Sequence, residues 1–162
     1  MLTTDITKNV AFTGHRTGRI SQPLLWLYVD MVSEIRRLYS LGYRNFLSGM
    51  AEGGDLIFAK AVTAVRQECT DMKLVAVVPF RNQSERYTTA NKALYQQMLR
   101  EADKTVILSE SYYKGCFHRR NDYLTDYAEV MLAYWDKRPY GGTYYTIGKA
   151  QMLNRTIINL YK

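Results

Sequence analysis

The sequence predicts an α/β fold in three layers, with a mainly parallel sheet covered by helices on both faces. Short apolar runs of strand length alternate with longer segments whose apolar residues recur at helical spacing. The run at 73–78 is almost continuously apolar, which is typical of a central parallel strand buried on both faces. Strands that alternate with helices favour right-handed crossovers within one sheet.

The first expected strand, residues 8–14, is apolar in its middle and ends at Gly14. A helix follows because leucine, tyrosine, methionine, valine and isoleucine then recur at helical spacing. We expect Ser21 to be its N-cap, Pro23 to lie just inside its first turn, and Gly42 to end it.

The rest of the chain repeats this alternation. Further strands are expected at 45–48, 73–78, 105–108, 130–135 and 156–160, and further helices at 54–65, 91–102, 117–128 and 143–153. Neither an internal repeat nor a low-complexity linker interrupts these elements. We therefore expect residues 1–162 to form a single domain.

Composition excludes several classes of protein. Hydrophobic residues make up 47% and charged residues 23% of the chain, as in ordinary globular proteins. The chain has no apolar run long enough to span a membrane, and residues 1–8 do not resemble a signal peptide. Cys69 and Cys116 do not form a Cys-x-x-Cys pair, so we expect neither a metal site nor a disulfide framework. We expect a cytoplasmic protein.

The charge balance is basic, with 22 Lys and Arg against 15 Asp and Glu, a formal net charge of +7. Such a charge suits an anionic partner, either a small ligand or nucleic acid. The basic residues are scattered, and no run of five or more occurs. This distribution favours a small phosphate-bearing ligand over nucleic acid. A homo-oligomer is compatible with it, and we expect no membrane partner.

In a parallel sheet, ligands bind outside the carboxyl ends of the strands, so the loops after the strands are the informative ones. The first such loop begins with Gly14, whose lack of a side chain permits close approach of a ligand. Arg16 and Arg19 could hold a phosphate through forked donors. His15 could act as an acid, a base or a hydrogen-bond donor, or could hold the loop in place.

The loop after the second expected strand is also rich in glycine. Gly49 follows the strand, and Gly53 and Gly54 open a helix whose N-terminus could face a phosphate. Asp55 could cap that helix or contact the ligand. Glu52 lies between glycines, where it could bind ribose hydroxyls or serve as a general base.

The loop after the fifth expected strand repeats the arrangement. Gly141 and Gly142 precede a helix, and Thr143 could cap it or donate to a phosphate. Asp136 ends the strand and could orient a ligand hydroxyl. The polar pair Arg120-Asn121, on the helix before this strand, forms either a solvated helix face or part of the site.

Taken together, these motifs resemble the YpsA-like family of the SLOG superfamily, whose Rossmann-like relatives include DprA and the LOG proteins. The resemblance covers nearly the whole chain and rests on Thr13-Gly14-His15-Arg16, Ser48-Gly49-x-x-x-Gly53-Gly54-Asp55, Arg120-Asn121, Tyr134-x-Asp136 and Gly141-Gly142-Thr143-x-Tyr145-Thr146. It implies a Rossmann-like fold and a site for a nucleotide or a nucleotide-derived ligand such as NAD or ADP-ribose.

The resemblance leaves three functions open. The first, which we favour, is a binding or sensor module. The second is a hydrolase of an N-glycosidic or phosphoryl bond, with Glu52 or His15 as catalytic candidates. LOG enzymes carry Pro-Gly-Gly-x-Gly-Thr-x-x-Glu, however, and the segment 139–143 lacks the second Gly-Thr and the glutamate. The third is a DprA-like nucleic-acid-associated protein, although basic residues interleaved with aromatics are not evident.

Overall fold

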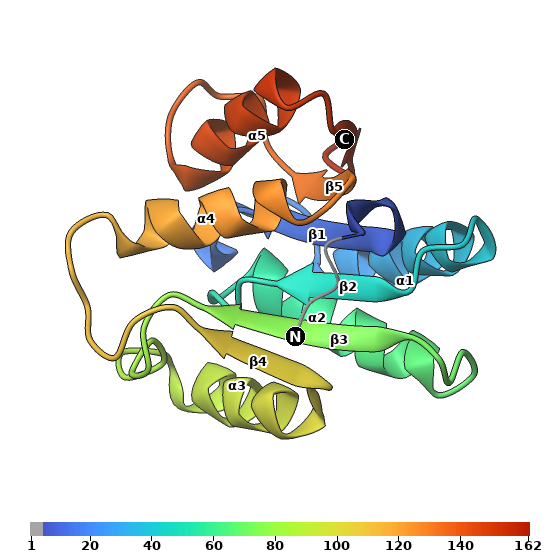
Figure 1. Cartoon of the computed structure of the whole chain (residues 1–162). Helices are drawn as coiled ribbons and strands as arrows, with labels where there is room; N and C mark the ends of the chain where they lie inside the picture. The colour runs from blue at the N-terminus through green and yellow to red at the C-terminus, as the bar shows by residue number, and fades with distance from the viewer. Residues whose placement is uncertain (1–4) are drawn as a thin grey trace.

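The protein folds around one sheet of parallel strands, seen here in a computed structural model that describes residues 5–162. Within these residues the sheet has six strands in the order β4-β3-β2-β1-β5-β6 (Figure 1). The strands are β1 (Asn9–Gly14), β2 (Asn45–Ser48), β3 (Lys73–Val78), β4 (Lys104–Ile107), β5 (Val130–Tyr134) and β6 (Thr156–Asn159). Every neighbouring pair is parallel, which confirms the predicted fold class.

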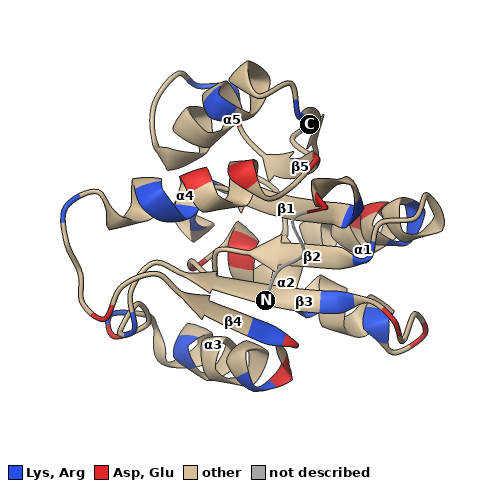
Figure 2. Ribbon diagram, viewed as in Figure 1, with Lys and Arg blue, Asp and Glu red and all other residues tan. Residues whose placement is uncertain are grey.

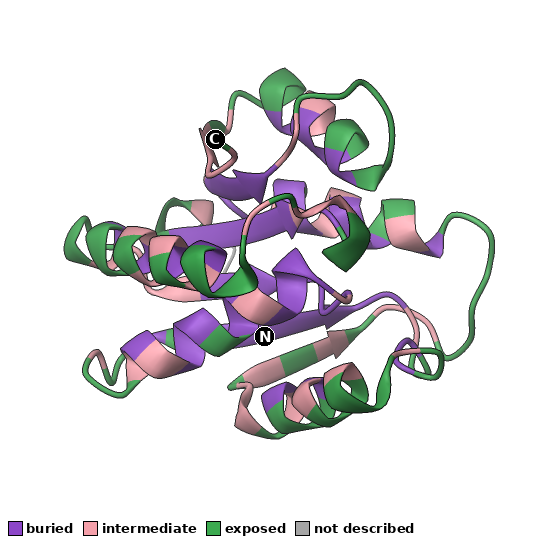
Figure 3. Ribbon diagram, turned by 180° about the vertical axis from the view of Figure 1, so that it is seen from behind, coloured by how far each residue is buried: buried purple, intermediate pink, exposed green. Residues whose placement is uncertain are grey.

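Helices cover both faces of this sheet. They are α1 (Leu24–Ser40), α2 (Gly54–Arg66), α3 (Thr89–Glu101), α4 (Cys116–Asp126) and α5 (Gly142–Met152). Apolar side chains of α1, α2 and α3 share one core with one face of the sheet, while α4 and α5 pack on the other face. Buried residues accordingly gather on the strands and on the inward sides of the helices (Figure 3).

The start of α1 differs from the prediction. Its four buried residues, Leu27, Met31, Ile35 and Leu38, follow the helical spacing that the sequence indicates. The N-cap position, however, belongs to Pro23 and not to Ser21. The backbone N–H and hydroxyl of Ser21 instead lie 3.1 Å from the Tyr134 hydroxyl, at the end of β5. A contact with a distant strand therefore replaces the local cap.

The strand order reverses direction between β1 and β5. The chain builds outward from β1 to β4, then returns through α4 to place β5 on the other side of β1. The carboxyl ends of β1 and β5 therefore border the crevice in which open α/β sheets bind ligands. Because all six described strands are parallel, the glycine junctions after β1, β2 and β5 lie at this one edge, as predicted.

The predictions that the chain has neither a signal peptide nor a membrane span concern residues that the structure describes only in part. The segment 1–8, judged not to be a signal peptide, includes residues 1–4, which lie outside the described part of the chain. In residues 5–162, no helix combines the length and apolar character needed to cross a bilayer.

Candidate functional site

A cavity of ≈ 630 Å³ opens at the reversal point of the sheet, and we call it the switch-point cavity. Its walls come from the end of β1 and the loop after it, the loop before α2, the first turns of α4, and the start of α5. The lining residues are Phe12, Thr13, Gly14, His15, Arg16, Arg19, Ala51, Asp55, Lys114, Gly115, Phe117, His118, Arg120, Asn121, Leu124, Gly142 and Thr143. Its volume falls in the range of small-molecule sites.

Two helices begin at this cavity. Gly115 is the N-cap of α4 and Gly141 is the N-cap of α5, both with positive φ (98° and 97°) and neither with a side chain to cap the helix. The first backbone N–H groups of a helix have no partner within it, and the helix dipole makes this end positive. Gly142 and Thr143, in the first turn of α5, line the cavity. These two helix ends favour an anion.

Basic side chains add to the positive potential of the cavity. Arg16 is exposed at its rim and, among the described residues, its guanidinium has no ion pair or hydrogen bond. It lies over the ring of Phe117, whose centroid is 5.7 Å from the guanidinium carbon, and its charge acts on Asp55 and Arg120. Lys114 lies on the loop that leads into α4, where Lys and Arg are grouped (Figure 2).

A buried arginine and a buried aspartate form the cavity floor. Arg120 donates hydrogen bonds to the Gly49 carbonyl and, at 2.8 Å, to the side-chain oxygen of Asn121. A Cβ atom on Gly49 would lie 2.7 Å from the Arg120 side chain, so a larger residue here would displace the guanidinium from its present position. The Asp55 carboxylate accepts a hydrogen bond of 3.2 Å from the backbone N–H of Ala51.

Burial shifts the pKa of both floor groups against their charged forms. It raises the pKa of the Asp55 carboxyl, a rise that the charge of Arg120 opposes. It lowers the pKa of the Arg120 guanidinium, which the charge of Asp55 counteracts. Asp55 lies in the first turn of α2, whose N-cap is Gly53, so the expected capping role is wrong.

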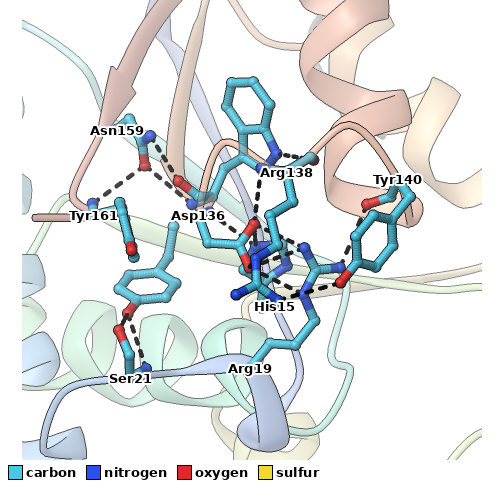
Figure 4. A network of polar contacts seen from close by, with 10 residues as sticks. His15, Arg19, Ser21, Asp136, Arg138, Tyr140, Asn159 and Tyr161 are labelled. Carbon is cyan, nitrogen blue, oxygen red and sulfur yellow. Dashed lines mark hydrogen bonds and ion pairs between the residues drawn. The ribbon is translucent and has the colours of Figure 1, made fainter.

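Arg19 and Asp136 form a bidentate ion pair beside the cavity (Figure 4). The distances are 2.7 Å from Arg19 Nη2 to Oδ1 and 3.2 Å from Nε to Oδ2. Partial burial acts to raise the pKa of the Asp136 carboxyl, but hydrogen bonds from Arg19 and from the backbone N–H of Arg138 lower it to about 2. Arg19 also lies over the Tyr140 ring, at 4.4 Å. The pair therefore fastens the loop after β5 to the loop after β1.

His15 joins the same cluster. Its Nε2 lies 3.0 Å from the backbone N–H of Asp136 and 3.1 Å from Oδ1 of that residue, and one nitrogen cannot both accept from the first and donate to the second. Burial and the charge of Arg19 lower the pKa of the imidazole. We therefore assign the neutral ring, with Nε2 as acceptor and the proton on Nδ1. Among the described residues Nδ1 has no partner.

Glu52 lies away from the cavity lining. Its carboxylate accepts from the backbone N–H of Thr88 at 3.1 Å and from the side-chain amide of Asn91 at 2.8 Å, at the start of α3. A carboxylate at a helix N-terminus is stabilised by the dipole and by free N–H groups. This residue therefore fastens the loop before α2 to α3, and its carboxylate is engaged there.

Gly53 and Gly54 allow the start of α2 to approach the loop after β1 closely. The Gly54 N–H donates to the His15 carbonyl at 3.1 Å, so this N–H is already used. A Cβ atom on Gly53 would lie 2.6 Å from the backbone nitrogen of Thr17 and 2.7 Å from the His15 oxygen. These glycines therefore hold the start of α2 against the loop after β1.

The structure brings together part of the predicted set of site residues. Gly14, His15, Arg16, Asp55, Arg120, Asn121, Gly142 and Thr143 line the cavity, whereas Gly49, Glu52, Gly53, Gly54, Asp136 and Gly141 lie behind it or beside it. Sequence reasoning missed Lys114, Gly115, Phe117 and His118. The signal was present, because Gly115 precedes a helix in the loop after β4, at the same edge as the other glycine junctions. In residues 5–162, no group of three or more His, Cys, Asp or Glu side chains could hold a metal ion.

The parallel sheet, its reversal point and the glycine-capped helices there define a Rossmann-like α/β protein. The particular family follows from sequence: the YspA SLOG family (YpsA) matches residues 23–159, and the chain belongs to it.

Among relatives, the UPF0398 protein of Bacillus velezensis is 22% identical over 157 residues, covering 92% of this chain and 86% of that protein. The UPF0398 protein YpsA of Bacillus subtilis is 27% identical over 101 residues, or 61% and 56% of the two chains.

Solved structures show the same fold. DNA processing protein A (DprA) from Streptococcus pneumoniae superposes with a TM-score of 0.65 at 19% identity. The match covers 94% of this chain but spans only half (50%) of the DprA chain. TM1055 superposes with a TM-score of 0.59 at 18% identity, covering 93% of this chain and 72% of its own.

Proposed function

We propose that this protein binds a phosphate-bearing nucleotide or nucleotide-derived ligand, such as NAD or ADP-ribose, as a binding or sensor module. The observation that carries this proposal is the switch-point cavity, where the starts of α4 and α5 and the unpaired Arg16 guanidinium meet. Free N–H groups, two helix dipoles and a forked cation all favour phosphate. We propose also that residues 1–162 act as one domain in the cytoplasm.

Arg16→Ala tests the phosphate site. We expect the variant to lose about 1.5–3 kcal/mol of nucleotide affinity, the range for hydrogen bonds to a charged group, which corresponds to roughly a 10- to 150-fold rise in Kd. Isothermal calorimetry with AMP, ADP-ribose and NAD measures it. Arg86→Ala is the matched control, because Arg86 is exposed and lies outside the cavity lining. Equal affinity of the wild type and Arg16→Ala would refute the phosphate role of Arg16.

Hydrolysis is the second function that the cavity supports. Glu52 is engaged at α3, so the described cavity groups with a free polar atom suited to proton transfer include Nδ1 of His15, the Asp55 carboxylate and the His118 imidazole. Turnover of nucleoside monophosphates, NAD or ADP-ribose by the wild type, lost in His15→Gln or Asp55→Asn, would select this function over binding alone.

Nucleic-acid binding is the third. The net charge of +7 and the fold shared with a DNA processing protein support it. It predicts oligonucleotide affinity that falls steeply with salt. Fluorescence anisotropy between low and physiological salt measures this dependence, and affinity that does not change with salt would exclude it.

A further inference from the structure

Two buried groups on the cavity floor carry atoms that are free to bind a ligand. Asp55 is 5% exposed, and its Oδ2 accepts from Ala51 while its Oδ1 has no hydrogen-bond partner among the described residues. Arg120 is also 5% exposed, and its Nη1 and Nε are engaged by Gly49 and Asn121, whereas its Nη2 has no partner within the same range.

In the described part of the chain, the buried side-chain atoms without a partner are Gln83 Oε1 and Tyr95 Oη, so the free atoms of Asp55 and Arg120 remain accessible although most of each side chain is buried. Asp55 and Arg120 both line the switch-point cavity, so a ligand there could reach them. They come from different helices, α2 and α4. The floor thus presents a carboxylate acceptor and a guanidinium donor to one space.

This pair of groups differs in chemistry from the phosphate site. A phosphate placed against Asp55 would meet a like charge, whereas the free Arg16 guanidinium and the α5 N-terminus offer donors alone. Neighbouring hydroxyl groups of a sugar both donate and accept, so one could donate to Asp55 Oδ1 while another accepts from Arg120 Nη2. A sugar with two neighbouring hydroxyl groups would therefore pair with both free atoms of the cavity floor.

We infer that Asp55 and Arg120 form a subsite for the sugar hydroxyls of the ligand, with its phosphate held by Arg16 and the start of α5. The inference rests on the proposed nucleotide-binding function and deepens it. It moves the sugar contact from Glu52 to Asp55, three residues later and in the first turn of α2, because only the second carboxylate lines the cavity.

The test compares ribose and 2′-deoxyribose ligands. Calorimetry would measure Kd for AMP, ADP-ribose and their 2′-deoxy counterparts, with inorganic phosphate as a probe of the phosphate site alone. We expect the wild type to bind the ribose ligand at least about tenfold more tightly, as for the loss of a hydrogen bond to a charged group. In Asp55→Asn, which keeps the shape and the acceptor for Ala51, the ratio should fall to roughly 1–3, since hydrogen bonds to neutral groups are about half as strong.

Glu52→Gln is the matched control, because it makes the same chemical change three residues away and outside the cavity lining, and it should keep the wild-type ratio. Equal binding of ribose and deoxyribose ligands by the wild type would overturn the inference while leaving the proposed function standing. A ratio unchanged in folded Asp55→Asn would do the same. Should Asp55→Asn fail to fold, the wild-type ratio decides. No binding of any nucleotide or of phosphate would overturn both.

Discussion

Gly53→Ala should destabilise the protein strongly, because Gly53 joins two walls of the cavity. Its φ is +95°, a conformation that residues with a side chain rarely adopt. The three atoms nearest to an added Cβ are all backbone: the Thr17 nitrogen at 2.6 Å, the His15 oxygen at 2.7 Å and the Arg16 carbonyl carbon at 2.8 Å. Backbone atoms cannot rotate away as a flexible side chain can.

The magnitude follows from two costs. Forcing a residue other than glycine into this region of φ and ψ costs about 1–3 kcal/mol. Overpacking against backbone costs about 1–3 kcal/mol more. Alanine also lowers the conformational entropy of the unfolded chain. This stabilising effect is smaller than the two costs, because the native conformation at Gly53 is incompatible with a side chain. We expect a loss of about 2–6 kcal/mol, a large part of the total stability of a typical domain.

Urea denaturation followed by circular dichroism measures this loss, and Gly148→Ala is its matched control. Gly148 lies inside α5, and nothing lies within 4 Å of its added Cβ. Alanine there should stabilise the protein by roughly 0.5–1 kcal/mol, since it favours the helix. A Gly53→Ala variant as stable as the wild type would refute the tight contact between α2 and the loop after β1.

Two further predictions concern the cluster beside the cavity. Because the pKa of Asp136 is lowered to about 2 in the folded protein, its contribution of about 1–2 kcal/mol to the free energy of unfolding is present above pH 4 and is lost as the pH falls toward 2. Urea titrations at pH 4.5 and pH 2.5 should therefore show a smaller loss of stability in Asp136→Asn than in the wild type. An equal loss in the two proteins would contradict the ion pair. Tyr134→Phe removes the hydroxyl that accepts a hydrogen bond from the Ser21 backbone. It should lower the free energy of unfolding by about 1–2 kcal/mol without altering phosphate binding. A variant as stable as the wild type in the same denaturation assay would count against this bond.

Local patterns in the sequence determined the order of the elements and the edge of the sheet at which the glycine junctions gather. The six strands and five α-helices described in residues 5–162 lie within a few residues of their predicted positions, because continuous apolar runs mark the central strands and burial at helical spacing marks the helices. The parallel arrangement then placed the glycine junctions at one edge. Prediction failed at the α1 cap, where Ser21 contacts Tyr134, over a hundred residues away.

Tertiary structure alone decided which polar groups line the switch-point cavity. Glu52 and Asp55 lie three residues apart and have the same chemistry, yet Asn91 of α3 engages one and the cavity floor holds the other. Arg16 and Arg19 are alike in the sequence, but of the two only Arg19 pairs with Asp136, in the loop after β5. In each case the role of the side chain depends on a partner from a distant segment, which the strand order brings close. No short stretch of sequence encodes such a contact, because its energy is gained only after distant segments pack together.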